Sequence, residues 1–162
     1  MLLLGSMVFI IGIIWLLPGE KQYTQRVIVD CTPTAATRVM SDVTQWSKWW
    51  PGEIKADRVF LFNHQPIQIQ TILLNGFYAN ISIEHIPVFI DIQFLSAPKK
   101  QSEFSYTYTL YYSTNPLIKL LQLFQSGTVK SELDLLLNGI KSNLEDVKKV
   151  YGFEIIEERL PN

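Results

Sequence analysis

The chain has 162 residues, of which 48% are hydrophobic, 12% aromatic and 18% charged, a composition that fits one domain with an appendage and excludes an intrinsically disordered chain. Fourteen basic and fifteen acidic residues give a formal net charge of −1, so the composition shows no electrostatic footprint for nucleic acid. A single cysteine, Cys31, excludes an intramolecular disulfide.

An uncharged apolar run opens the chain, from Leu2 to Leu17, and Pro18-Gly19 follows it as a helix stop. As a helix the run would span roughly 24 Å, slightly less than a hydrocarbon core about 30 Å thick. A cleaved signal peptide and a buried core helix are the alternatives, although the run has no basic n-region, no A-x-A cleavage site and no polar stripe. We therefore expect residues 1–18 to form a single-pass N-terminal membrane anchor, with the side of the membrane left open.

A strand and two short helices are expected next. Residues 22–30 alternate between apolar and polar side chains, as in a strand. Thr32-Pro33 is typical of a helix start, with a hydroxyl N-cap followed by proline, and the helix is expected to run to about Val43. A second short helical turn ends at Pro51-Gly52. It carries three tryptophans, Trp46, Trp49 and Trp50.

Between residues 57 and 114 the pattern predicts strands alone. Short alternating runs separated by turn residues indicate an antiparallel meander, with Asn75-Gly76 as a hairpin signal. The last run is the clearest, because tyrosines and Phe104 fall on one face and polar residues on the other. The expected strands are 57–63, 67–74, 78–86, 88–95 and 103–113.

The period then becomes helical. Asn115-Pro116 predicts the start of a short helix, Leu117 to Gln125, that is apolar on nearly every side apart from Lys119 and Gln122. Ser126-Gly127 is expected to break this helix.

A long amphipathic helix is expected from about Thr128 to Tyr151. Six strands, 22–30 and the five between 57 and 113, with helices at both ends predict an α+β fold in which this helix covers the concave face of a curved antiparallel sheet. Such packing leaves a cavity between sheet and helix. We expect residues 19–152 to form this domain and 153–162 a strand or tail. The helix residues expected on the sheet are Leu133, Leu136, Leu137, Ile140 and Leu144.

This order of elements resembles a known superfamily. A strand, two short helices ending in Trp46-x-x-Trp49-Trp50-Pro51, an antiparallel run and a long terminal helix resemble the START-like, polyketide-cyclase and lipid-transport (SRPBCC) superfamily with its helix-grip fold. More narrowly, the chain resembles the membrane-anchored half of bacterial proteins that continue into a gyrase-inhibitor-like effector-binding domain, which would begin near 151–155. The superfamily contains both binding proteins and enzymes, so the resemblance implies a pocket but no particular reaction.

Candidate ligand-binding residues lie mainly on the expected cavity face. Tyrosine offers apolar area together with a hydroxyl that can orient a ligand. His85 is expected on the same strand face as Ile81 and Ile83, where it could contact a polar ligand group. Ordinary core packing is the alternative for every one of these side chains. The candidates are His85, Phe104, Tyr106, Tyr108, Tyr112 and Trp49.

The sequence predicts no catalytic residues, metal site or cofactor. Its two histidines, His64 and His85, are not at metal-ligand spacing, and no G-x-S-x-G motif occurs. Asp91 is expected to face outward from its strand.

The leading interpretation is therefore a membrane-tethered, non-catalytic domain that binds a hydrophobic small molecule or lipid. Its expected partners are that ligand and, through residues 1–18, the membrane. Two alternatives remain: a scaffold or sensory module that acts through a protein partner, and a cyclase- or hydrolase-type enzyme with His85 or Asp91 as general base.

Overall fold

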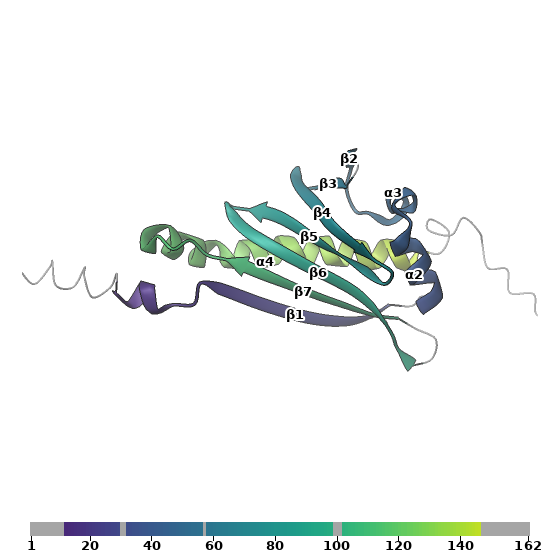
Figure 1. The fold of residues 1–162 in the computed structure, drawn as a ribbon, viewed down its shortest axis with the longest axis horizontal. Coiled ribbons are helices and arrows are strands. Elements are labelled where there is room, and N and C mark those ends of the chain that lie inside the picture. Colours follow the sequence, from purple (N-terminus) through teal and green to yellow (C-terminus); the bar gives the residue numbers. More distant parts are fainter. Residues whose placement is uncertain (1–11, 30–31, 57, 99–101, 147–162) are drawn as a thin grey trace, which may run out of the picture.

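The computed structural model describes residues 12–29, 32–56, 58–98 and 102–146, which form one antiparallel sheet with a long helix along one face (Figure 1). The strand order is β1-β7-β6-β5-β4-β3-β2, which confirms the expected α+β class. The strands are β1 (Glu20–Val29), β2 (Ile54–Ala56), β3 (Val59–Phe62), β4 (Gln65–Leu73), β5 (Gly76–Ile83), β6 (Ile86–Ser96) and β7 (Ser102–Tyr111). The helices are α2 (Pro33–Ser41), η1 (Val43–Gln45), α3 (Trp46–Trp49) and α4 (Pro116–Glu145).

The sheet has a buried apolar face toward α4. Alternate residues of each strand point to this face, and burying each large apolar side chain contributes about 1.5–3 kcal/mol. Its central residues come from β5 and β6, with β1, β4 and β7 on either side. They include Val29, Ile67, Ile69, Phe77, Ile81, Ile83, Val88, Ile90, Ile92, Phe94 and Leu110.

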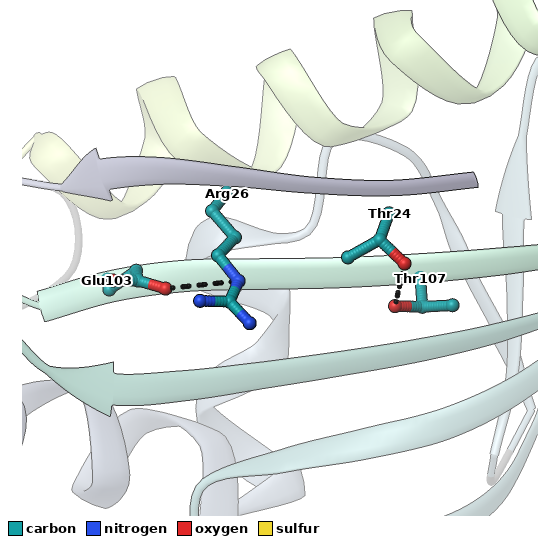
Figure 2. Close-up of polar contacts among 4 residues, drawn as sticks. All are labelled: Thr24, Arg26, Glu103 and Thr107. Carbon is teal, nitrogen blue, oxygen red and sulfur yellow. Dashed lines mark hydrogen bonds and ion pairs between the residues drawn. The ribbon is translucent and has the colours of Figure 1, made fainter.

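The opposite face carries polar cross-strand pairs between β1 and β7 (Figure 2). The Thr24 and Thr107 hydroxyls lie 3.0 Å apart, and Arg26 Nε lies 3.5 Å from Glu103 Oε1. Exposed pairs of this kind add at most about 1 kcal/mol each. They nevertheless agree with the register that places the β7 tyrosines on the face toward α4.

The short helix α3 and the residue after it, which carry Trp46, Trp49 and Trp50, close one end of this core. Thr32 caps α2 as expected, since its hydroxyl accepts a hydrogen bond from Ala35 N at 3.3 Å. Trp46 Nε1 donates to the Met40 carbonyl at 3.0 Å, and Trp50 Nε1 donates to the Leu61 carbonyl at 3.1 Å. The indole rings pack on two buried phenylalanines, Phe60 and Phe77.

The hairpin between β5 and β6 corrects the expectation for His85. Ile83 pairs with Ile86, so the two-residue turn is Glu84-His85, with φ angles of 51° and 61°. Positive φ at both positions suits the twist of a tight hairpin. The side chain of His85 is exposed in this turn and leaves the face of Ile81 and Ile83. Pro87, expected to separate two strands, instead lies inside β6.

The expected break at Ser126-Gly127 is also wrong. Helix α4 runs without interruption from Pro116 to Glu145, and the Asn115 side chain caps it by accepting from Leu117 N at 3.0 Å. A glycine inside a helix costs only about 1 kcal/mol, and the Ser126 hydroxyl bonds back to the Leu123 carbonyl at 2.7 Å. The expected sheet-facing residues are all buried: Leu133, Leu136, Leu137, Ile140 and Leu144.

Because α4 is not broken at Ser126-Gly127, the helix is longer than the strands that it covers. Its 30 residues extend about 45 Å at about 1.5 Å per residue. The longest strand, β6, has 11 residues and extends about 36 Å at about 3.3 Å per residue. The first turns of α4 therefore project beyond the strands, at the end where residues 12–19 also lie (Figure 1).

Residues 12–16 form a helical turn ahead of β1. Within the described ranges, no helix is long and apolar enough to cross a membrane. Most of the expected anchor, residues 1–11, lies outside the described residues, as does the expected strand at 153–160. Both remain predictions, as do the expected domain boundaries.

Two glycines of α4 give opposite expectations for alanine substitution. Gly127→Ala is expected to raise the free energy of unfolding by about 0.5–1 kcal/mol, because alanine favours the helix and its methyl would have nothing within 4 Å. Gly139→Ala is expected to lower it by about 1–3 kcal/mol, because its Cβ would lie 2.7 Å from Pro51 Cβ. Denaturant unfolding measures both, and destabilisation by Gly127→Ala would contradict a continuous α4.

Candidate functional site

A row of aromatic side chains lies beneath α4 along β7. Phe104, Tyr106 and Tyr108 are buried on the face toward α4, as the alternation of β7 predicted. Their ring centroids are 5.7 Å apart for Phe104 and Tyr106 and 6.4 Å for the two tyrosines. Tyr23 of β1 stacks on Tyr108 with the centroids 5.0 Å apart. Tyr112 continues the row just past the end of β7.

The row carries polar groups inside an otherwise apolar interior. The Tyr106 hydroxyl donates to Gln25 Oε1 of the neighbouring strand. Burial, with a smaller contribution from the negative charge of Asp134 on α4, raises the pKa of Tyr106 to about 12 and also raises that of Tyr108. One Asp134 carboxylate oxygen is buried and has no hydrogen-bond partner among the described residues. The row is therefore a stripe of neutral hydroxyls near an acid.

A pocket of about 300 Å³ opens at the end of this row. It lies where the N-terminal segment, the residues after β7 and the first turn of α4 meet. Tyr112 N donates to the Gly19 carbonyl at 2.8 Å and so ties two of these segments together. A volume near 300 Å³ is at the lower end for small-molecule sites. Its lining residues are Trp15, Leu17, Gly19, Tyr112, Ser113, Thr114 and Lys119. We call it the end pocket.

Two polar residues of α4 face inward beside the end pocket. Lys119 is only 6% exposed and Gln122 only 5%. Gln122 Oε1 accepts from Ser113 N at 2.7 Å, and its Nε2 donates to the His85 carbonyl at 3.2 Å. The Lys119 ammonium donates to the Leu17 carbonyl. These bonds fix the start of α4 against the β5–β6 turn, the end of β7 and the N-terminal segment.

Lys119 gives the end pocket a positive charge. A lysine is rarely this buried unless it is paired. Its ammonium has three donors, and no carboxylate forms an ion pair with it in the described part of the chain. The sequence showed Lys119 only as a polar interruption of an apolar run, so its place in a site was missed. The one available signal was the spacing of three between Lys119 and Gln122 in that run.

The remaining candidates lie apart from the row. The His85 side chain lines a shallow surface pocket of about 350 Å³ with Gln65, Pro66, Ser82 and Glu84. Trp49 is buried against the far end of α4, where Asn143 Nδ2 donates to its carbonyl at 2.9 Å. Its indole N–H is buried and has no hydrogen-bond partner among the residues described.

The outer face holds the acid considered as a catalytic base. Asp91 lies half-buried on that face of β6 and accepts from Gln93 Nε2 at 3.1 and 3.3 Å. Its outward orientation is as expected. Within the described ranges, no three His, Cys, Asp or Glu side chains are close enough together to hold a metal ion.

Comparisons with known proteins define the fold. No family model and no curated protein matches the chain. Among solved structures, the di-domain ARO/CYC protein BexL of the BE-7585A biosynthetic pathway is similar, with a TM-score of 0.56, 9% identity, and 84% of this chain and 52% of that chain covered. Ara h 8.0201 is similar with a TM-score of 0.51 and 11% identity, and the match covers 78% of this chain and 98% of that chain. A Staphylococcus aureus protein of unknown function is similar with a TM-score of 0.53 and 10% identity, and the match covers 80% of this chain and 96% of that chain. BexL and Ara h 8.0201 have helix-grip folds, so the helix-grip fold expected from the resemblance is confirmed.

The buried hydroxyls predict a loss of stability in alkali. Because the pKa of Tyr106 is raised from about 10 in the unfolded chain to about 12, its contribution is complete below pH 10 and is lost as pH rises through 12. The free energy of unfolding should therefore fall over that interval, and tyrosinate absorbance should show a late step. The double substitution Tyr106→Phe, Tyr108→Phe should reduce both changes, and an unaltered alkaline loss in that variant would contradict the placement of the row.

Proposed function

We propose that this chain is a non-catalytic domain that binds a hydrophobic small molecule with an acidic end, such as a lipid, beside a membrane. The observation that carries the proposal is the end pocket, in which a buried lysine meets aromatic and apolar walls. The helix-grip fold supports it, because its helix crosses a sheet and leaves sites at the margins of their contact. Of the expected ligand-binding residues, Tyr112 lines the end pocket itself, and Lys119 joins it as a proposed contact.

The charge of Lys119 favours an acidic group. The Leu17 carbonyl accepts one of its hydrogen bonds, and a carboxylate or phosphate would accept others. A charge-assisted hydrogen bond contributes about 1.5–3 kcal/mol, roughly twice a neutral one. The ligand's acidic end is therefore proposed to lie at Lys119, with Ser113 and Thr114 as further polar contacts.

Apolar walls favour a hydrophobic body for the same ligand. The end pocket is lined by the apolar side chain of Leu17 and by the aromatic residues Trp15 and Tyr112. The row of Tyr108, Tyr106 and Phe104 continues inward from Tyr112 under α4 and offers apolar area with hydroxyls. We propose this row as the deeper part of the site.

A membrane location is proposed from the sequence of the first residues. The run Leu2–Leu17 has no charged side chain and is close to the length that crosses a hydrocarbon core. Its last residues, Trp15 and Leu17, are part of the end pocket. The pocket would therefore open next to the lipid that holds the chain.

The enzyme alternative has less support from the geometry. A general base must reach the substrate within hydrogen-bond distance, directly or through one water. His85 projects from an exposed turn and Asp91 lies on the outer face, so neither side chain points to the row or to the end pocket. A scaffold that acts through a protein partner remains the second candidate, because part of α4 exposes apolar side chains.

Photoaffinity labelling tests the ligand site. A photoactivatable fatty acid added to full-length protein in nanodiscs should label residues 112–119, as mapped by peptide mass spectrometry. Lys119→Gln should reduce labelling by the acid about tenfold, because about 1.4 kcal/mol of charge-assisted binding is lost, and should leave labelling by the corresponding alcohol nearly unchanged.

The matched control is Lys141→Gln, a lysine of the same helix that pairs with Glu145 at 3.9 Å. The fatty acid should label this variant as strongly as it labels the unsubstituted protein. Equal labelling of Lys119→Gln and Lys141→Gln by the acid would contradict the proposed role of Lys119.

Membrane fractionation tests the tether. The full-length chain should stay with membranes through an alkaline carbonate wash, whereas deletion of residues 2–11 should release it, because the remaining apolar residues are too few to span the core. The deletion keeps Trp15 and Leu17 of the end pocket. Full-length protein found in the soluble fraction would contradict the tether, and an intact mass lacking the first residues would indicate a cleaved signal peptide instead.

A further inference from the structure

The projecting part of α4 has most of its apolar side chains on the outside. Leu117 is 65% exposed, Leu121 58% and Phe124 79%, whereas Lys119 and Gln122 are buried. Steps of three and four residues place these apolar side chains on one face of the helix. This polarity is the reverse of that in the part of α4 over the sheet, where most of the leucines face inward: Leu133, Leu136, Leu137 and Leu144.

The N-terminal segment extends the same exposed apolar surface. Trp15 and Leu16 are exposed, and Leu17 is held to α4 by the Lys119 ammonium. Figure 1 places residues 12–19 and the start of α4 at the same end of the sheet. We call this surface the overhang patch. It consists of Trp15, Leu16, Leu117, Ile118, Leu121 and Phe124.

The overhang patch is also free of charge. Residues 111–129 contain one charged side chain, Lys119, which points inward, and residues 1–19 contain none. Large uncharged apolar patches on a monomer mark interaction surfaces. Water is therefore a poor solvent for the overhang patch itself, whose nearest charge on the neighbouring β5–β6 turn is that of Glu84, which accepts from Gln125 Nε2 at 3.3 Å.

We infer that the overhang patch lies in the surface of a lipid bilayer. The eleven residues before Gly12 carry no charged side chain, and the chain reaches the patch directly from them. Leucine, phenylalanine and tryptophan are the side chains that interfacial helices bury at the headgroup boundary. The inference rests on the proposed membrane association and adds the face by which the domain meets lipid.

This contact places the end pocket at the bilayer surface. Trp15 belongs both to the patch and to the pocket lining, and Lys119 approaches the pocket from the helix that carries the patch. An acidic amphiphile would then pass from the bilayer to Lys119 without leaving an apolar or interfacial environment.

Fluorescence quenching at two positions of α4 tests the inference. Full-length protein with Cys31→Ser carries an environment-sensitive fluorophore at Phe124→Cys, or at Leu135→Cys as the control, in phosphatidylcholine vesicles. Leu135 is 58% exposed on the same helix but lies over the sheet, outside the patch. Nitroxide-labelled lipid should quench the fluorophore at position 124 several-fold, and the apolar surroundings should shift its emission to the blue. Neither effect is expected at position 135. Leu121→Cys should repeat the result of position 124.

Three results would overturn the inference while the protein remains bound to vesicles. Position 124 could stay unquenched in a water-like environment, or it could be blue-shifted without quenching, which indicates coverage by a second copy or another protein segment. Equal quenching at positions 124 and 135 would place the contact elsewhere. If the protein does not bind vesicles at all, the proposed membrane tether is wrong together with this inference. The proposed ligand site is tested separately, by photolabelling of the end pocket.

Discussion

A helix of 30 residues laid along strands of about ten residues extends beyond the sheet. The surplus of roughly 10 Å, about two turns, has no sheet to cover. Burial of the sheet-facing leucines fixes the rest of α4 on the sheet. Because the helix is continuous, the projecting turns must follow the same helix axis. The projecting turns therefore meet different neighbours: the N-terminal segment, the β5–β6 turn and the residues after β7.

Those neighbours are largely backbone groups, which explains why polar side chains face inward there. The Leu17 and His85 carbonyls and Ser113 N are hydrogen-bonded by Lys119 and Gln122. Buried backbone groups must be paired, so a lysine and a glutamine are suited to these positions. Their inward placement leaves Leu117, Leu121 and Phe124 exposed and brings a positive charge to the end pocket.

Much of the fold is readable from local signals in the sequence. Thr32-Pro33 and Asn115-Pro116 start helices through caps that depend on adjacent residues, and the alternation of β7 assigns the tyrosine row to the face toward α4. Other features depend on distant partners. Gly127 stays helical because packing on either side offsets a small local penalty, and only the pairing of Ile83 with Ile86 shows that His85 is in a turn.

The strand β2 is exposed at all three residues, so its sequence shows no alternation that would predict a strand. The candidate site was likewise predictable only where it depends on local pattern. The row was predictable, but Lys119 was not, because its role depends on the Leu17 carbonyl about a hundred residues earlier.

The distance across Ser126-Gly127 in α4 tests the account most directly. Spin labels at Leu121→Cys and Leu135→Cys, with Cys31→Ser, lie 14 residues apart on nearly the same helix face and should give a narrow distribution near 21 Å at about 1.5 Å per residue. Pulsed electron paramagnetic resonance on full-length protein in vesicles measures it. A markedly shorter or two-peaked distribution would mean that the helix bends at Gly127. The overhang on which the end pocket and the inferred bilayer contact depend would then not exist.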